Sequence, residues 1–415
     1  MVTAELRPSG DMTDESPPPL PGAYWRQWTA SAISNLGDGI NFVAMPLLAL
    51  SLTDDERLLS LTVFATFVPW LVLALPVGVV VDRVERRSLM VAANLVRLVV
   101  FGGIAMAAID GRLEIWALVG LLVIVGSCEV LFDSTAQAFL PMLVEPDQLT
   151  RANGLLFAAE IVAGSLAGLA VGALLFDASP GLPFGTNALS FAIAAALIAT
   201  IRPGHPSVES ERGPGLGDLR LRAGFQWLRE HTLLRTLAAM FAVTNLGLMF
   251  GQGIFVKYAV EELGLDGLEF GLLLAITAMG AASGGLIGHR VIGMLGLRTT
   301  IVVPYLVFGA AQVVIGLTSR AWLVGAAGFL LGAAITIWNV VTVTIRQREI
   351  PPDRFGRVNA VYRWLGAAAS AIGVAAGGFV AYATTLRAPF LIGGGITLVA
   401  AMLFARPVLT NLDET

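Results

Sequence analysis

Apolar residues recur along the chain in long runs, and polar residues gather in the short gaps between these runs. Each run is long enough for a helix that crosses about 30 Å of hydrocarbon. Helices are expected because lipid offers no hydrogen-bond partner to an unpaired backbone group. The pattern therefore predicts an all-α membrane protein with twelve transmembrane helices. These lie near 28–52, 59–81, 88–109, 114–140, 151–176, 181–201, 234–258, 267–292, 299–318, 321–345, 355–382 and 386–405.

Composition supports the same class. Hydrophobic residues make up 56% of the chain and charged residues 13%, whereas about a quarter of an average soluble protein is charged. The single cysteine, Cys128, lies in an apolar run, which excludes an intrachain disulfide and a cysteine-cluster metal site. The sequence also lacks a phosphate-binding loop, a zinc motif and a nucleophile elbow. We therefore expect no cofactor, no metal, no nucleic-acid partner and no enzymatic activity.

The chain carries an internal duplication. The stretch 144–155 returns 206 residues later as 350–361. Four polar or proline positions of the first copy recur in the second: Pro146, Asp147, Arg151 and Asn153 match Pro352, Asp353, Arg357 and Asn359. Two hydrophobic halves in tandem are typical of transporters. The duplication predicts two pseudo-symmetric six-helix bundles.

The polar stretches suggest the domain limits. We expect a disordered cytoplasmic tail at 1–26, an N-terminal bundle at 27–201, a cytoplasmic linker at 202–233, a C-terminal bundle at 234–406 and a short tail at 407–415. Residues 216–231 of the linker alternate apolar and basic positions at helical spacing. They predict an amphipathic helix that either lies on the inner leaflet or is a solvated linker helix.

Arginine placement predicts the orientation. If both termini are cytoplasmic, most basic residues fall in the inner loops and the linker. The outer loops then hold only Arg57, Arg112, Lys257, Arg320 and Arg387. Because positive residues accumulate on the cytoplasmic side, we expect a multi-pass protein of the plasma (inner) membrane with both termini inside. We expect a monomer in the lipid bilayer.

The loop between the second and third segments carries a glycine, an aspartate, a base and a basic pair. These residues are Gly78, Asp82, Arg83, Arg86 and Arg87. The spacing resembles the inner-loop motif of the major facilitator superfamily, and Glu85 replaces the usual second glycine, as in the branch similar to macrolide and siderophore exporters. The resemblance covers 28–406 and implies the major facilitator fold. The matching loop of the second half is degenerate, with Gly288 and His289 in place of the acid and the base.

The resemblance implies a gating role for this loop. Gly78 would permit close helix approach, Asp82 would face a positive helix end, and the arginines would meet carboxylates across the domain boundary. Such contacts exist in only one of two rocking states and bias the equilibrium between them. The alternative is that the arginines only anchor the topology.

The fifth segment carries Gly164, Gly168 and Gly172 at intervals of four, and hence nearly on one helix face. Small residues at this spacing allow tight helix packing. Their placement resembles the fifth-helix motif of superfamily antiporters, except that Ser165 stands where a proline follows the first glycine. Ordinary helix packing is an equal alternative.

Ionisable groups within spanning helices are costly and suggest function. Asp38 lies about 15 Å from the start of its segment, at about 1.5 Å of rise per residue. Glu129 and Asp133 share one face of the fourth segment, and Glu160 and Arg97 also fall within predicted helices. We expect Asp38 and Glu129 to carry protons, with Arg97 as counter-ion, Asp133 as a carrier or gate contact and Glu160 in a coupling role. The alternative is a set of static bridges that hold the bundle.

A substrate cavity is expected between the halves. The first half offers polar Asn35 and Asn41 beside Asp38, and the second half offers aromatic, flexible and polar residues. The latter are Phe241, Asn245, Met249, Trp338, Asn339 and Arg363. Acidic groups opposite such a wall suit lipophilic, including cationic, molecules. Each aromatic residue has core packing or lipid contact as its alternative role.

The sequence as a whole predicts a secondary active transporter that exports lipophilic drugs, secondary metabolites or siderophores in exchange for protons by alternating access. Two alternatives stay open. One is import of a small metabolite. The other is a non-transporting membrane sensor or assembly protein with the same fold.

Overall fold

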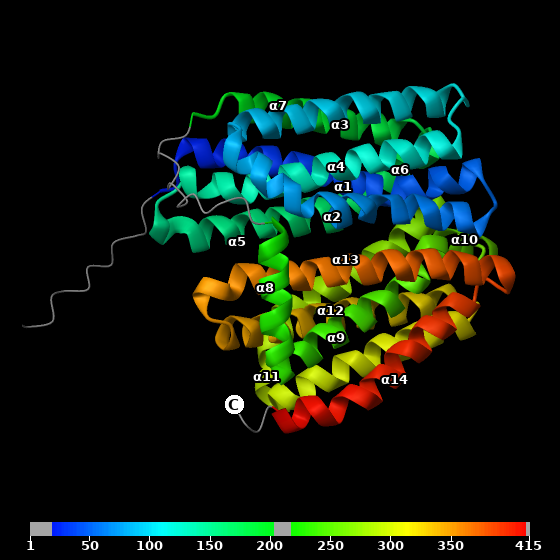
Figure 1. Ribbon diagram of the computed structural model, residues 1–415. Helices are drawn as coiled ribbons and strands as arrows, with labels where there is room; N and C mark the ends of the chain where they lie inside the picture. Colours follow the sequence, from blue (N-terminus) through cyan, green and yellow to red (C-terminus); the bar gives the residue numbers. More distant parts are fainter. Residues whose placement is uncertain (1–18, 203–216, 412–415) are drawn as a thin grey trace, which may run out of the picture.

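The computed structural model describes residues 19–202 and 217–411, and helix is the only regular secondary structure in these ranges. The helices form two bundles, one above the other in the view of Figure 1, and the helix axes of both bundles run in roughly the same direction. The first bundle contains α1 (Gly22–Leu52), α2 (Glu56–Arg83), α3 (Arg86–Ile109), α4 (Ile115–Phe139), α5 (Leu149–Ala159), the π-helix η3 (Glu160–Gly168), α6 (Leu169–Ala178) and α7 (Leu182–Ala199). The second contains α9 (Thr232–Phe250), η4 (Gln252–Ile254), α10 (Phe255–Glu261), α11 (Gly267–Leu317), α12 (Ala321–Glu349), α13 (Pro352–Ala383) and α14 (Ala388–Asn411). In sequence, α8 (Gly217–Glu230) stands between the two bundles, and the short 3₁₀ turns η1 (Leu140–Met142) and η2 (Pro146–Gln148) join α4 to α5.

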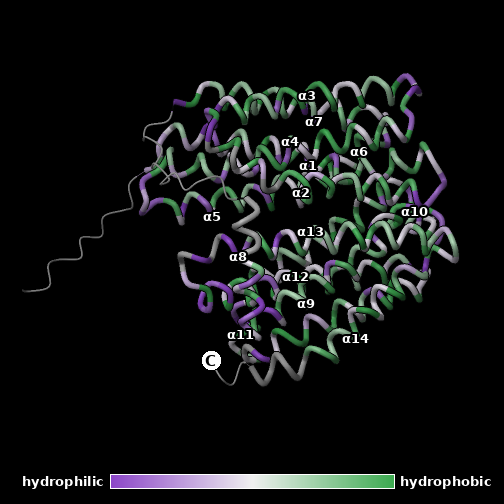
Figure 2. Tube along the Cα trace, viewed as in Figure 1, coloured by the Kyte–Doolittle hydropathy of each residue, from purple (hydrophilic) through white to green (hydrophobic). Residues whose placement is uncertain are grey.

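The described residues contain 11 helical spans long and apolar enough to cross a membrane, and a shorter apolar helix at Ala388–Phe404. Two of the spans lie in α11, which is interrupted at Gly296, where the backbone φ is 74°. Hydrophobic residues dominate the lengths of the helices, and hydrophilic residues gather near their ends (Figure 2). The predicted all-α, multi-pass membrane fold is therefore confirmed.

The two ends of the bundles differ. We call the end that carries α8 the linker end, and the opposite end, where α2 begins at Glu56 and α13 ends at Ala383, the loop end. At the loop end the side chain of Asp55 caps α2. Asp266 and Glu269 form a reciprocal capping box at the start of α11. Each cap supplies acceptors for backbone N–H groups that a helix start leaves unpaired.

The first helix begins earlier than the sequence suggested. Residues 22–26, which the sequence predicts to be part of a disordered tail, belong to α1. The Tyr24 hydroxyl donates to the Ala152 carbonyl oxygen at 2.9 Å, and the Trp28 Nε1 donates to the Leu155 carbonyl oxygen at 3.0 Å. These bonds fix the start of α1 against α5, a partner that local sequence does not reveal.

Glycines bring α1 against the middle of the fifth span. A Cβ on Gly39 would overlap the carbonyl oxygen of Gly164, and one on Gly168 would lie 2.7 Å from the Gly39 Cα. A Cβ on Gly172 would overlap the carbonyl oxygen of Ile40. The tight packing expected of this glycine face is confirmed. The nine-residue π-helix η3 that carries Gly164 and Gly168 was not expected from the sequence.

The linker helix α8 crosses the direction of the bundle helices (Figure 1). Trp227 and Leu228 are buried in the core of the second bundle. A Cβ on Gly224 would lie 2.8 Å from the Arg357 carbonyl oxygen of α13. The predicted helix is present, and the buried residues of its described part pack against the second bundle.

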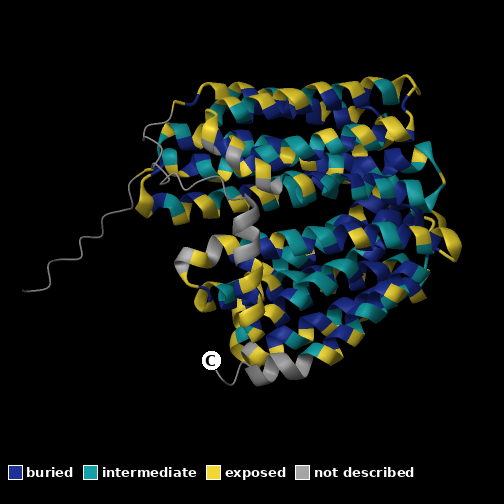
Figure 3. Cartoon of the chain, in the orientation of Figure 1, coloured by how far each residue is buried: buried dark blue, intermediate teal, exposed yellow. Residues whose placement is uncertain are grey.

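Large apolar side chains are exposed on the outside of the bundles, and buried residues lie toward their interiors (Figure 3). Val99 is 72% exposed, Met106 is 71% and Met294 is 84%. An apolar surface of this kind suits lipid, because hydrocarbon chains replace water around it.

Candidate functional site

Three acidic residues midway along spans of the first bundle belong to one charged cluster. Asp38 on α1 and Glu129 on α4 are exposed, although both lie midway along spanning helices, and Asp133 on α4 is half-buried. Glu129 lies within electrostatic reach of Asp133, Asp38 and Arg97. The structure therefore brings together four of the five residues expected to couple protons.

Asp38, Glu129 and Asp133 all lie within electrostatic reach of Arg97, which forms no ion pair within the described residues. Its side chain on α3 is buried, and its Nη2 donates to the Cys128 carbonyl oxygen at 3.1 Å. The guanidinium carbon lies 4.9 Å from the Phe132 ring centroid and 5.0 Å from that of Phe191. Its Nε finds no hydrogen-bond partner. Cation–π contacts and one carbonyl stabilise the charge, and Asp38 remains within electrostatic reach of it.

Polar residues of α7 complete the surroundings of Asp38. Asn187 and Ser34 lie near the Asp38 carboxyl group, and the buried Nδ2 of Asn187 has no hydrogen-bond partner within the described residues. Asn187 is fully buried, and its Oδ1 accepts from the Ser190 hydroxyl at 3.0 Å. The sequence reasoning missed Asn187. The signal available was an asparagine within an otherwise apolar segment, which is costly in a membrane unless it finds partners.

Two other polar residues stand apart from these contacts. Asn94 on α3 is fully buried, and neither amide atom has a hydrogen-bond partner. Asn41, expected in the substrate cavity, has a buried Oδ1 that is also unpartnered. Asn35 is half-buried on α1, where its carbonyl oxygen faces Gly164.

Glu160 lies at the start of η3 and is exposed. It is within electrostatic reach of Asp133. It therefore extends the charged cluster toward the fifth span, and no hydrogen bond or ion pair is recorded for it within the described residues.

The expected gating loop shows no contact across the bundles among its described side chains. Arg86 Nη1 donates to the Met142 Sδ at 3.0 Å, and Arg87 Nη2 lies 3.0 Å from Glu85 Oε1. Arg83 is exposed, and the side chain of Asp82 lies outside the described residues. A Cβ on Gly78 would meet no atom within 4 Å. No close helix approach is therefore found at Gly78 among the described residues of this conformation, and the gating role stays a prediction.

Trp338 does not line an opening. It is 3% exposed within the core of the second bundle, and its ring stacks on Phe241 with a centroid distance of 6.0 Å. The expectation that Trp338 forms a cavity wall is corrected to core packing. Trp338 is adjacent in sequence to Asn339, which is exposed.

Other expected cavity residues retain polar or flexible character. Asn245 Nδ2 donates to the Phe241 carbonyl oxygen at 2.8 Å, and its Oδ1 accepts from Ser370 at 3.3 Å. Met249 is half-buried on α9. Arg346, in contrast, is held by the Asn359 Oδ1 at 3.0 Å.

Arg363 reaches from the second bundle to the first. Its guanidinium carbon lies 4.9 Å from the centroid of the Trp70 ring on α2. It is also within electrostatic reach of Asp133 on α4. The acidic cluster of the first bundle therefore meets a cation of the second bundle about halfway along the helices.

The loop end is closed by a buried lysine, the only lysine of the chain. Lys257 Nζ on α10 lies 2.7 Å from Glu56 Oε1 on α2, and it also donates to the Asp54 carbonyl oxygen. The Arg57 guanidinium carbon stacks 3.7 Å from the Tyr382 ring centroid of α13. Both contacts join the two bundles. The sequence alone indicates only an outer-loop charge at Lys257.

The described residues hold no group of three or more His, Cys, Asp or Glu side chains able to bind a metal ion. The arrangement instead offers carboxyl groups near the buried Arg97 and a polar boundary between two bundles. Such groups can take up and release protons and can attract charged molecules.

Comparison with known proteins gives a consistent family. A model of the family described as transmembrane secretion effector matches residues 18–415. The chain is 23% identical over 408 residues to macrolide efflux protein A of Streptococcus pyogenes, covering 94% of this chain and 96% of that protein. It is 26% identical over 414 residues to the multidrug efflux pump Tap of Mycobacterium tuberculosis, covering 92% and 93%.

The fold also matches solved transporters. A bacterial homologue of the iron transporter ferroportin, in an inward-facing state, superposes with a TM-score of 0.76 at 17% identity. The match covers 93% of this chain and 98% of that one. At this identity the likeness concerns the fold alone.

Proposed function

The chain belongs to the transmembrane secretion effector family of major facilitator transporters, and on that premise we propose that it exports lipophilic small molecules in exchange for protons by alternating access. The protein is a multi-pass membrane transporter of this superfamily. Relatives named for macrolide and multidrug efflux support drugs and related secondary metabolites as the substrate class.

One observation carries the proton coupling. Asp38 and Glu129 are exposed at mid-helix positions and lie within electrostatic reach of the same buried cation, Arg97. Ionised groups at that depth are costly, and a structural role would be better served by closed ion pairs. Within the described residues, however, Arg97 forms no ion pair and binds a carbonyl oxygen instead. The carboxyl groups are thus free to exchange protons.

The proton cycle follows from these contacts. When Asp38 loses its proton, its negative charge attracts Arg97 and the donors of Asn187 and Ser34. When it gains a proton, that attraction disappears and the cation relaxes toward Phe132 and the Cys128 carbonyl oxygen. Because these groups come from α1, α3, α4 and α7, proton uptake changes the balance of forces between helices. Glu129, one α4 turn from Asp133, extends the same response toward the boundary with the second bundle.

Alternating access requires the bundles to rock about the boundary. Contacts of Lys257 with Glu56 and of Arg57 with Tyr382 hold the loop end together, so they must break when that end opens. The loop with Gly78, Asp82, Arg83, Arg86 and Arg87 would then close the linker end. This assignment is consistent with Arg86 and Arg87 contacting only their own bundle in the present conformation.

The substrate would bind between the bundles. Asn35 and Asn41 of α1, with Met249, Asn339 and Arg363 of the second bundle, provide mixed polar and flexible contacts. The acidic cluster favours molecules with a cationic group. We also propose that the linker end and both termini face the cytoplasm, that the protein resides in the plasma membrane, and that it acts as a monomer.

The test is transport in proteoliposomes with an imposed pH gradient. Efflux of a lipophilic fluorescent dye and accompanying proton movement are measured for the wild type, Asp38→Asn and Glu129→Gln. We expect each variant to lose gradient-driven transport while it still folds, because the carboxyl group that exchanges the proton is gone. Asp110→Asn, an exposed acid at the end of α3, serves as the control and should transport normally.

The outcomes separate the alternatives. Unchanged gradient-driven transport in both variants would refute the coupling site. Dye movement in the opposite direction would indicate an importer. A folded wild-type protein that moves no dye, drug or metabolite would favour a non-transporting membrane protein.

A further inference from the structure

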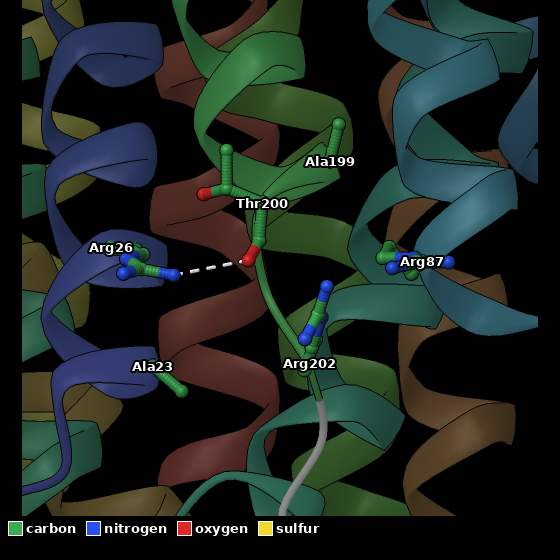
Figure 4. A pocket seen from close by; sticks show the side chains of 6 residues that line it. All are labelled: Ala23, Arg26, Arg87, Ala199, Thr200 and Arg202. Atoms are coloured by element: carbon green, nitrogen blue, oxygen red, sulfur yellow. Dashed lines mark hydrogen bonds between the residues drawn. The ribbon is translucent and has the colours of Figure 1, made fainter.

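A basic cavity of about 550 Å³ lies at the linker end of the first bundle, away from the acidic cluster. Its walls come from α1, the start of α3, the end of α7 and the residues that follow α7 (Figure 4). The lining residues are Ala23, Arg26, Arg87, Ala199, Thr200 and Arg202. Three guanidinium groups therefore surround one cavity.

Two of these arginines are positioned by the end of α7. Arg26 Nη1 donates to the Thr200 carbonyl oxygen at 3.0 Å, and Arg87 Nη1 donates to that of Ile201 at 3.3 Å. A helix C-terminus attracts cations, so these two bonds alone are explained by capping of the C-terminus of α7. Each guanidinium has five N–H donors, and one such bond leaves further donors available.

Arg202 has no such structural role. Figure 4 shows its side chain between those of Arg26 and Arg87, and it is exposed. No hydrogen bond or ion pair of Arg202 is found within the described part of the chain. Within the described residues, the carboxylate that pairs with one of these three arginines is that of Glu85, which binds Arg87. The cavity thus retains a net positive charge and suits an anion.

A second cavity of about 340 Å³ continues from the first along α3. The two share Arg87 and Ala199 as lining residues. The other residues of the second cavity are Ser88, Val91, Ala92 and Leu95. This lining is mainly apolar, and it leads toward the exposed apolar surface of α3, where Leu95 is 47% exposed.

The position also suits the boundary between lipid headgroups and hydrocarbon. Trp25, next to Arg26 on α1, is 43% exposed. Tryptophan is enriched at this level of a membrane because its ring is apolar and its N–H is polar. The exposed tryptophan lies beside the basic cavity, and the apolar groove runs from that cavity along α3.

We propose that the two cavities together bind one anionic phospholipid from the leaflet at the linker end. The phosphate is held by Arg26, Arg87 and Arg202, since guanidinium groups match phosphate geometry. One acyl chain lies in the groove along Val91 and Leu95. A soluble phosphate would fill only the first cavity. The site shares Arg87 with the proposed gating loop, but its test measures lipid binding and does not depend on transport.

The experiment measures lipid binding to the full-length protein in a neutral detergent. The probes are phosphatidylglycerol, zwitterionic phosphatidylcholine and inorganic phosphate, and retained lipid is counted by native mass spectrometry. We expect phosphatidylglycerol to bind at least about tenfold more tightly than the other two. Arg202→Gln should remove most of this preference. Arg202 forms no hydrogen bond or ion pair within the described residues, so this variant should fold normally. Arg26→Gln provides a second variant.

Two controls define specificity. Arg112→Gln removes an exposed arginine at the loop end of the same bundle and should leave the preference unchanged. Ala92→Trp fills the apolar groove, and it should weaken long-chain phosphatidylglycerol while short-chain phosphatidylglycerol binds as before. Ala117→Trp, on the exposed face of α4, is its matched control and should have no effect.

Several results would overturn the proposal. Equal binding of phosphatidylglycerol and phosphatidylcholine would exclude an anion-selective lipid site. Inorganic phosphate that binds as tightly as phosphatidylglycerol would indicate a soluble-anion site. An equal loss in Arg202→Gln and Arg112→Gln would indicate nonspecific attraction to a basic protein.

Discussion

At the scale of single residues, the charged groups of this protein differ mainly in what neutralises them. Arg97 is buried against two phenyl rings and a carbonyl oxygen, whereas Lys257 is buried against the Glu56 carboxylate. A paired charge stabilises one arrangement of helices. A cation without a carboxylate partner responds when a neighbouring acid changes protonation. The first arrangement suits a clamp, and the second suits a proton-driven response.

Asp55 gives a pH-dependent prediction outside the membrane spans. Hydrogen bonds from the Arg57 side chain, and then from its backbone N–H, hold the pKa of Asp55 below its ordinary value. Because an unfolded aspartate titrates near about 3.9, this carboxylate stabilises the folded protein fully above about pH 4. The contribution is lost as pH falls through the lower pKa of the folded state.

We therefore expect Asp55→Asn to lower thermal stability at about pH 6 and to show a smaller loss than the wild type on acidification to about pH 3. Thermal unfolding in detergent across this pH range measures the effect. Asp110→Asn should follow the wild-type curve. Parallel curves for Asp55→Asn and the wild type would contradict the prediction.

At the scale of elements, the contact between α1 and η3 depends on missing side chains. Gly39 and Gly164 bring the two backbones together. The π-helical turns of η3 lie at this contact, next to Glu160 at one end and opposite the α1 segment that carries Asp38. Stretches of π-helix are frequent at functional sites. Close backbone packing here keeps Asp38 at a fixed height relative to the fifth span.

Gly39→Ala is expected to destabilise the protein by about 1–3 kcal/mol, because the new methyl group overlaps the Gly164 carbonyl oxygen and the helices must separate. Thermal unfolding in detergent measures this loss. Gly120→Ala is the matched control, since a Cβ there meets no atom within 4 Å. The control should be neutral or slightly stabilising because alanine favours helix. Equal stability of the two variants would show that the contact tolerates a side chain.

At the scale of the whole molecule, the two bundles are joined from the loop end to the middle of the helices. Lys257 with Glu56, and Arg57 with Tyr382, lie at the loop end, and Arg363 with Trp70 lies farther in. Recorded side-chain contacts of the gating loop stay within the first bundle. This asymmetry describes a conformation closed at the loop end. Opening that end exposes Lys257, which is 6% exposed here.

Lys257 therefore reports the conformation through its amine, because the chain has no other lysine. Glu56→Gln removes the carboxylate of the first bundle that lies 2.7 Å from the buried ammonium group and leaves only Glu261 of its own bundle, 3.7 Å away, so it should favour opening of the loop end. We expect a water-soluble amine reagent to modify Lys257 several times faster in this variant than in the wild type, as measured by peptide mass spectrometry. Glu262→Gln is the control, because Glu262 pairs with Arg387 within the second bundle at the same end. Similar rates for Glu56→Gln and Glu262→Gln would show that the Glu56 pair does not hold the bundles together.

The sequence by itself determined the class of fold, the helical spans and the duplication. These follow from properties that are local or periodic: the length of apolar runs, the absence of hydrogen-bond partners in lipid, and a repeat at a fixed offset. The sequence also identified the candidate acids, because an ionisable residue within an apolar run can be recognised without knowing how the helices pack.

Only the tertiary structure decided which residues meet. Asn187 and Asp38 lie far apart in sequence, and their contact depends on how α7 packs against α1. Trp338 was expected in the wall of the substrate cavity, but the aromatic rings around it place it in the core of the second bundle. Lys257 looked like a loop charge, yet a residue of the other bundle neutralises it. Helical periodicity gives each residue a face of its own helix, and only the packing of helices determines what that face touches.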